Sequence, residues 1–197
     1  MQNYKQPLKP GCFYHVYNRG NNGENLFYTH KNYQFFLRRY DEFLSPLVET
    51  YAFCLLPNHF HLLIRVKGSS EVSPFEKVKP LPHQAFQRLF TSYAMAINKQ
   101  QDRTGSLFQK PFKRLQVNNT RYLANLVFYI HANPQLHSIV PNFRDYPWSS
   151  YNRILDNKPT ALNKSAVVEW FSSPANYVSY HTKKMGSWVK SVEMYYI

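Results

Sequence analysis

Hydrophobic and polar positions in the first half of the chain predict three strands and one helix. Segments 12–20 (CFYHVYNRG), 49–56 (ETYAFCLL) and 59–66 (HFHLLIRV) are rich in aromatic and β-branched residues, which is typical of strands. Pro57-Asn58 between the last two is a turn signal, so these two strands should form a hairpin. Over 31–44, apolar side chains recur at helical spacing, which predicts a helix between the first two strands.

The second half continues with further helices and one strand. Segment 83–98 is apolar on one side and predicts a second long helix, preceded by a polar loop over 68–82. Segment 107–117 predicts a fourth strand, broken or bulged at Pro111. A third helix should begin near residue 120 and end at about Ala132. This order predicts an α+β fold of ferredoxin-like type, an antiparallel sheet with helices on one face.

The chain length fits one domain with an extension. We expect a domain over residues 1–147 and a C-terminal helical extension over 148–197. Cys12 and Cys54 lie far apart in apolar surroundings and should be free thiols. No signal peptide and no run of roughly 20 apolar residues occur, so we expect a cytoplasmic protein with no membrane partner.

The charge balance favours a polyanionic partner. Lys and Arg number 24 against 11 Asp and Glu, a net charge of +13, and nucleic acid is the commonest partner of such chains. Between residues 103 and 144 there is no acidic residue at all. A solvated basic face would look the same for any single residue. The candidate DNA contacts are Arg19, Arg103, Lys110, Lys113, Arg114 and Arg121.

His59 and His61 are the first candidates for chemistry. They are two residues apart on a predicted strand, so both imidazoles lie on the same face and Phe60 points into the core. Two neutral imidazoles side by side form half of a metal site. Spacing alone fits equally well two exposed histidines that happen to alternate.

The end of the third predicted helix carries the second set of candidates. Tyr129 and Asn133 are four residues apart and can share a helix face, although Pro134 disfavours helical geometry at Asn133. A tyrosine hydroxyl can act as a nucleophile, and a carboxamide oxygen can be a third metal ligand. Tyr129 could instead be a core aromatic. No glycine-rich phosphate loop and no zinc-type Cys/His spacing occur.

Four motifs in order give the chain a resemblance to a known family. LLPNHFHLLI, GSLFQKPFKRLQV, YLANLVFYIHANP and YPWSSY, with YHVYNRG before them, resemble the single-tyrosine HUH transposases, where HUH denotes His-hydrophobic-His. The most similar branch is the REP-associated tyrosine transposases, domesticated relatives of bacterial insertion-sequence transposases. The resemblance covers roughly residues 10–151.

The resemblance implies a site and an activity. Tyr129 would be the catalytic tyrosine, with Tyr122 as its competitor two turns earlier. His59, His61 and Asn133 would bind Mg²⁺ or Mn²⁺. The implied reaction is metal-dependent cleavage and rejoining of single-stranded, hairpin-containing DNA through a 5′-phosphotyrosine. The implied protein is bacterial and nucleoid-associated, and works as a monomer or a homodimer.

Two other functions remain open from the sequence. A sequence- or hairpin-specific DNA-binding protein that has lost cleavage would keep the fold and the charge. A metallo-hydrolase of small phosphoesters would need a carboxylate base near the metal, and the sequence offers no strong candidate.

Overall fold

A four-stranded antiparallel sheet forms the centre of the computed structural model, which describes residues 6–68, 71 and 81–188, without the side chains of Thr120, Arg121 and Trp188. The strand order is β2-β3-β1-β4, so β1 lies between β3 and β4 and a helix connects non-adjacent strands. The predicted α+β class and ferredoxin-like topology are therefore confirmed. The elements are β1 (Phe13–Arg19), η1 (Asn21–Gly23), α1 (His30–Leu44), β2 (Val48–Leu56), β3 (His59–Val66), α2 (Pro82–Gln100), β4 (Lys113–Val117), α3 (Thr120–Leu136), η3 (Phe143–Asp145), α4 (Tyr151–Leu155), α5 (Lys164–Trp170) and α6 (Pro174–Trp188).

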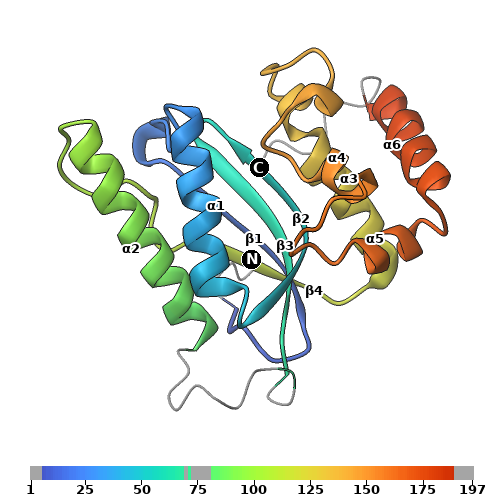
Figure 1. The fold of residues 1–197 in the computed structure, drawn as a ribbon, viewed down its shortest axis with the longest axis horizontal. Coiled ribbons are helices and arrows are strands. Elements are labelled where there is room, and N and C mark those ends of the chain that lie inside the picture. The colour runs from blue at the N-terminus through green and yellow to red at the C-terminus, as the bar shows by residue number, and fades with distance from the viewer. Residues whose placement is uncertain (1–5, 69–70, 72–80, 189–197) are drawn as a thin grey trace.

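Helices α1 and α2 cover one face of the sheet, as Figure 1 shows. Phe60 of β3 is fully buried there and packs against Phe36 of α1 and Phe90 of α2. Because side chains alternate along a strand, the burial of Phe60 on this face directs His59 and His61 to the other.

The opposite face is covered by α3 and the C-terminal helices, a second layer that was not predicted (Figure 1). Strand β2 explains why this layer is needed: eight of its nine residues are buried, including Cys54 and Leu56 on the α3 side. A strand buried on both faces reads as a near-continuous apolar run, as ETYAFCLL does. Helices α4 to α6 of the predicted extension add Tyr151, Val167 and Tyr177 to the same apolar cluster as α3.

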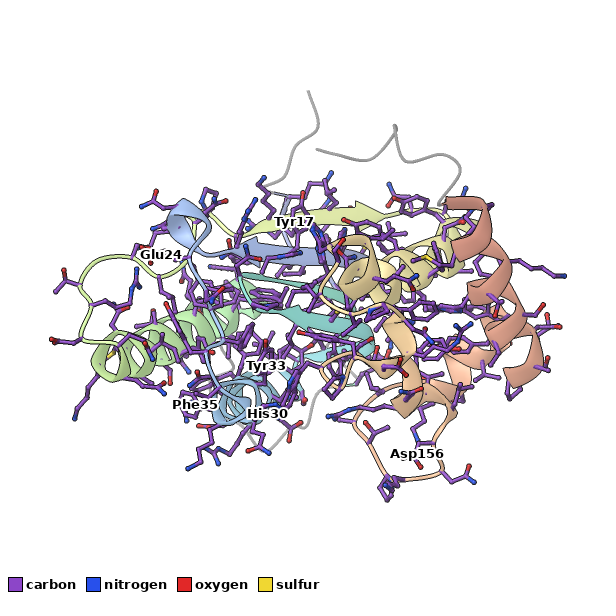
Figure 2. The ribbon with its side chains drawn as sticks, turned by 90° about the horizontal axis from the view of Figure 1, so that it is seen from above. Tyr17, Glu24, His30, Tyr33, Phe35 and Asp156 are labelled. Atoms are coloured by element: carbon purple, nitrogen blue, oxygen red, sulfur yellow. The ribbon has the colours of Figure 1, made fainter. Side chains whose placement is uncertain are left out.

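Trp148 to Ser150 run along β2 before α4 begins, where a helix was expected from Trp148. The Leu55 N–H donates to the Trp148 carbonyl at 2.9 Å, and the Ser150 N–H donates to the Phe53 carbonyl at 2.9 Å. The Trp148 ring stacks on Tyr33 of α1, labelled in Figure 2, at 4.5 Å between centroids. The YPWSSY motif therefore covers part of the β2 edge, which would otherwise present unpaired backbone groups.

Two further expectations concern proline-containing segments. Strand β4 covers only the end of predicted segment 107–117, and Phe108, before the cis Lys110–Pro111 peptide, forms a separate bridge to Gly20. Helix α3 continues through Pro134 to Leu136, beyond its predicted end. Most of the predicted 68–82 loop lies outside the described residues.

In the described part of the chain, no helix is long and apolar enough to cross a membrane.

A candidate metal and nucleophile site

The predicted histidine pair lies on β3, facing α3. His59 pairs with Arg19 of β1 and His61 pairs with Tyr17, and the two imidazole centroids are 5.3 Å apart. His61 is almost entirely buried, whereas His59 is half-buried. The structure thus places both imidazoles on one face, as their spacing predicted.

Hydrogen bonds at Nδ1 orient the His59 ring. Its Nδ1 lies 2.7 Å from the Asn58 Oδ1, and the Asn58 amide nitrogen donates to the Gly23 carbonyl at 3.3 Å. The Asn58 oxygen is therefore the acceptor, His59 carries its proton on Nδ1, and its Nε2 keeps a lone pair. A metal-binding imidazole needs that lone pair.

Helix α3 brings Tyr129 and Asn133 to the histidines. The Tyr129 ring packs edge-on against His61, with centroids 5.4 Å apart, and Tyr129 is half-buried. Asn133 is fully buried one turn later, and its amide nitrogen donates to the Tyr129 carbonyl at 2.6 Å. Because the helix continues through Pro134, Asn133 keeps its helical position despite the proline that follows it.

The Asn133 Oδ1 is buried and accepts no hydrogen bond of regular geometry among the described residues, although the Asn133 side chain lies close enough to His59 to oppose the lowering of its pKa. A buried carbonyl oxygen without a partner costs about 1–3 kcal/mol, so such an atom calls for an explanation. An oxygen of this kind beside two neutral imidazoles fits a divalent cation bound by nitrogen and oxygen ligands. In the described part of the chain, no three His, Cys, Asp or Glu side chains are arranged as a metal site.

Three residues join the site that the sequence analysis did not select. His15 and Tyr17 lie on β1, with their rings 5.1 and 5.6 Å from the His61 ring. They alternate in YHVYNRG as the histidines alternate in HFH, so period-two spacing could have found them. His137, exposed just after α3, lies 4.8 Å from His59 between ring centroids. No local pattern links His137 to a strand so distant in sequence.

Burial keeps the imidazoles of the site uncharged. Burial lowers the pKa of His15 to about 3, and burial together with His137 and Arg19 lowers that of His59 to about 4. Burial also holds the pKa of His61 well below its usual value. Uncharged imidazoles at neutral pH are the form that binds metal.

The pKa of the Tyr129 hydroxyl is shifted upward, whereas those of the imidazoles are shifted downward. Burial raises its pKa, with a smaller rise from nearby Tyr122 and an opposing effect of Asn133. Tyr122, the predicted competitor, is about half exposed on the first turn of α3. The Tyr129 ring contacts two histidines, His61 and, at 6.1 Å between centroids, His15.

The candidate DNA-contacting residues do not share one surface. Arg19 is exposed beside His59, and Lys113 is exposed over the Tyr17 ring, which Figure 2 marks on β1. Arg114 alternates to the other face, where its guanidinium lies over Phe112. Among the rest, Lys110 is exposed, Arg103 is bound to Glu24 and Asn98, and the Arg121 side chain lies outside the described residues.

The chain is similar to known proteins in sequence and in fold. No protein-family model matches the chain. A Haemophilus influenzae protein assigned to the REP-associated tyrosine transposases is 32% identical over 107 residues, which are 53% of this chain. The aligned part spans 60% of that relative's length. A solved structure of a REP-associated tyrosine transposase bound to a REP hairpin superposes with a TM-score of 0.60, at 20% identity, over 81% of this chain and 89% of its own.

The fold comparison includes most of the chain, and the sequence comparison includes about half of it. Both name the family that the ordered motifs resemble, so that resemblance is confirmed. In sequence and in fold, the chain is similar to the REP-associated tyrosine transposases.

Proposed function

We propose that the chain is a REP-associated tyrosine transposase that cleaves and rejoins single-stranded, hairpin-containing DNA through a 5′-phosphotyrosine at Tyr129. The observation that carries this proposal is the packing of Tyr129 against His61, one helical turn before the buried oxygen of Asn133. A hydroxyl nucleophile and three metal-binding atoms thereby come from two elements in contact. The related structure bound to a REP hairpin supports hairpin DNA as the partner.

The residues proposed to hold the ion are His59, His61 and Asn133. The ion, Mg²⁺ or Mn²⁺, supplies charge neutralisation at the scissile phosphate. Nitrogen-rich ligands favour Mn²⁺ over Mg²⁺, whereas the resemblance allows both.

The proposed reaction exchanges one phosphoester bond for another and therefore consumes neither ATP nor water. The Tyr129 hydroxyl oxygen forms a bond to phosphorus as the bond from phosphorus to the 3′ oxygen breaks. The hydroxyl proton leaves Tyr129, and the departing 3′ oxygen gains one, so no net proton is consumed. A 3′-hydroxyl of a second strand reverses the step and rejoins the DNA.

The surroundings of the site suit a phosphodiester. No carboxylate is among the groups that shift the pKa values of His59, His61, His137 or Tyr129 in the described part of the chain. Arg19 lowers the pKa of His59 and His137, which places a positive charge at the exposed side of the site. We propose that Arg19 and Lys113 position the DNA backbone there. Such a protein would act in the bacterial nucleoid, as a monomer or a homodimer.

The test is covalent adduct formation with a labelled single-stranded oligonucleotide carrying a hairpin, in the presence of Mn²⁺ or Mg²⁺. Wild type and Tyr122→Phe should form the adduct, and Tyr129→Phe should not, although it still binds the hairpin. The two variants are matched, since each removes one hydroxyl from α3. An adduct from Tyr129→Phe but not from Tyr122→Phe would assign the nucleophile to Tyr122.

Adduct formation, together with hairpin-binding and Mn²⁺ titrations of the same protein, separates the two alternatives. A DNA-binding protein without cleavage would bind the hairpin, form no adduct and show no stoichiometric Mn²⁺ site. A hydrolase of small phosphoesters would show weak, salt-insensitive DNA binding.

A further inference from the structure

His15 of β1 lies within hydrogen-bonding distance of His61 on the neighbouring strand β3. The His15 Nε2 is 2.9 Å from the His61 Nδ1, and the two rings are stacked at 26°. In the β1–β3 register, Tyr17 is opposite His61 and His15 is opposite Leu63, so His15 reaches His61 along the diagonal. Alternation places His15 on the same face of the sheet as the histidine pair.

Only one proton can lie between these two nitrogens when both rings are neutral. If His15 donates, the His61 Nδ1 accepts, the single ring N–H proton of His61 is on Nε2, and that atom cannot bind a cation. If His61 donates from Nδ1, its Nε2 keeps a lone pair. The second arrangement is also that of His59, whose Nδ1 donates to Asn58.

We propose that His15 is a positioning residue that accepts the Nδ1 proton of His61 and so fixes the tautomer in which the His61 Nε2 can bind the divalent ion. This inference rests on the proposed metal-binding role of His61. His15 itself contacts neither the ion nor the DNA. Groups that orient metal-binding histidines in this way commonly contribute 10–100-fold to metal affinity.

The environment of His15 restricts its ring to this hydrogen bond. The Tyr17 ring stacks on His15 at 4.8 Å, and the Tyr129 ring meets it edge-on at 6.1 Å. A ring held by two aromatic neighbours presents its Nε2 in one direction. The same contacts mean that removing His15 could also disturb packing, so the test must separate shape from hydrogen bonding.

The first experiment measures Mn²⁺ affinity by electron paramagnetic resonance of free Mn²⁺, in the Tyr129→Phe background so that no cleavage occurs. His15→Phe keeps a ring but has no acceptor, and its Kd should rise by about 10–100-fold. His15→Gln places an acceptor oxygen at about the position of the His15 Nε2 and should recover most of the affinity. His83→Phe, which replaces an exposed histidine at the start of α2, is the matched control and should bind as the parent does.

Unchanged affinity in His15→Phe would overturn the proposal, as would equal losses in His15→Phe and His15→Gln, which would indicate packing alone. Thermal unfolding of each variant without metal checks that the fold is retained.

The second experiment reads the tautomer directly, by nitrogen-15 NMR of histidine-labelled protein without metal. His61 should carry its proton on Nδ1 in wild type and lose this preference in His15→Phe. A proton on the His61 Nε2 in wild type overturns the role of His15 whatever the metal result. The expected tautomer together with no Mn²⁺ site overturns the proposed function instead.

Discussion

At the scale of single residues, Asn133 combines two local features that cost stability. Its buried oxygen accepts no hydrogen bond of regular geometry in the described part of the chain, although its amide nitrogen is bonded to the Tyr129 carbonyl. Helical geometry also continues past it into Pro134, which removes a backbone donor. Costly local features of this kind gather at functional sites, where a ligand satisfies them.

Replacing Asn133 by leucine should preserve stability and abolish metal binding. The variant loses one hydrogen bond, about 0.5–1.5 kcal/mol, but removes a buried oxygen whose desolvation costs about 1–3 kcal/mol. Without metal, the free energy of unfolding should be at least that of wild type. Saturating Mn²⁺, at 100 times Kd, should stabilise wild type by about 2.7 kcal/mol and the variant much less. Urea unfolding with and without Mn²⁺ measures both, and full Mn²⁺ stabilisation of the variant would exclude Asn133 as a ligand.

At the scale of secondary-structure elements, a buried polar network ties α3 to β2 and α6. The Ser150 hydroxyl lies 2.7 Å from the His131 Nε2, and the His131 Nδ1 lies 3.1 Å from the His181 Nε2. The His181 Nδ1 donates to the Tyr177 carbonyl at 2.8 Å. Burial keeps both imidazoles neutral, so the His131 Nδ1 donates to the His181 Nε2 and the His131 Nε2 accepts from the Ser150 hydroxyl. His131 is two residues from Tyr129, and this network holds α3, the helix of the proposed nucleophile, on the sheet.

Burial disfavours the charged form of these histidines, so stability should depend on pH. Burial lowers the pKa of His181 to about 4 and that of His131 well below its usual value. Since an unfolded histidine titrates near pH 6.5, stability is complete above that pH and falls as the pH drops below it towards 4. From its shift, His181 contributes a loss of about 2 kcal/mol between pH 7.5 and pH 5.

Urea unfolding at pH 7.5 and pH 5.0 checks this prediction. His181→Phe should be less stable than wild type at pH 7.5, because it removes the acceptor of His131. Its further loss at pH 5.0 should be about 2 kcal/mol smaller than that of wild type. His83→Gln, at an exposed position, should keep the wild-type decrease. An unchanged decrease in His181→Phe would show that this imidazole does not control the pH response.

At the scale of the whole molecule, the sheet separates two surfaces with different roles. Helices α1 and α2 close one face with an aromatic core, and α3 closes the other around the histidines (Figure 1). The chain carries a net charge of +13, but basic residues that are neighbours in sequence can lie on different faces of the molecule. Lys113 and Arg114 are neighbours in sequence but face opposite sides of β4, so only Lys113 lies beside the site.

Lys113→Ala should therefore weaken hairpin binding and reduce its salt dependence. Losing one phosphate contact lowers the slope of log affinity against log salt by about 0.7–0.9. Lys31→Ala is the matched control, since Lys31 is exposed on α1, across the sheet from the site. Fluorescence anisotropy at several salt concentrations measures both slopes. Equal slopes for Lys113→Ala and wild type would place the DNA elsewhere.

Local pattern was enough to predict the central strands and helices, the α+β class and the shared face of His59 and His61. Strand alternation and helical spacing act over a few residues, so they can be read directly. The same rule placed Phe60 in the core and Tyr129 one turn from Asn133. Charge, too, depends on composition alone.

Tertiary structure alone decided how these pieces meet. The contact of His15 with His61 depends on strand register, and that of His137 with His59 on where α3 ends. Packing of α3 keeps Asn133 helical although Pro134 opposes that geometry locally. Such contacts join residues distant in sequence, and their energies arise only when the whole sheet and its covering helices have formed.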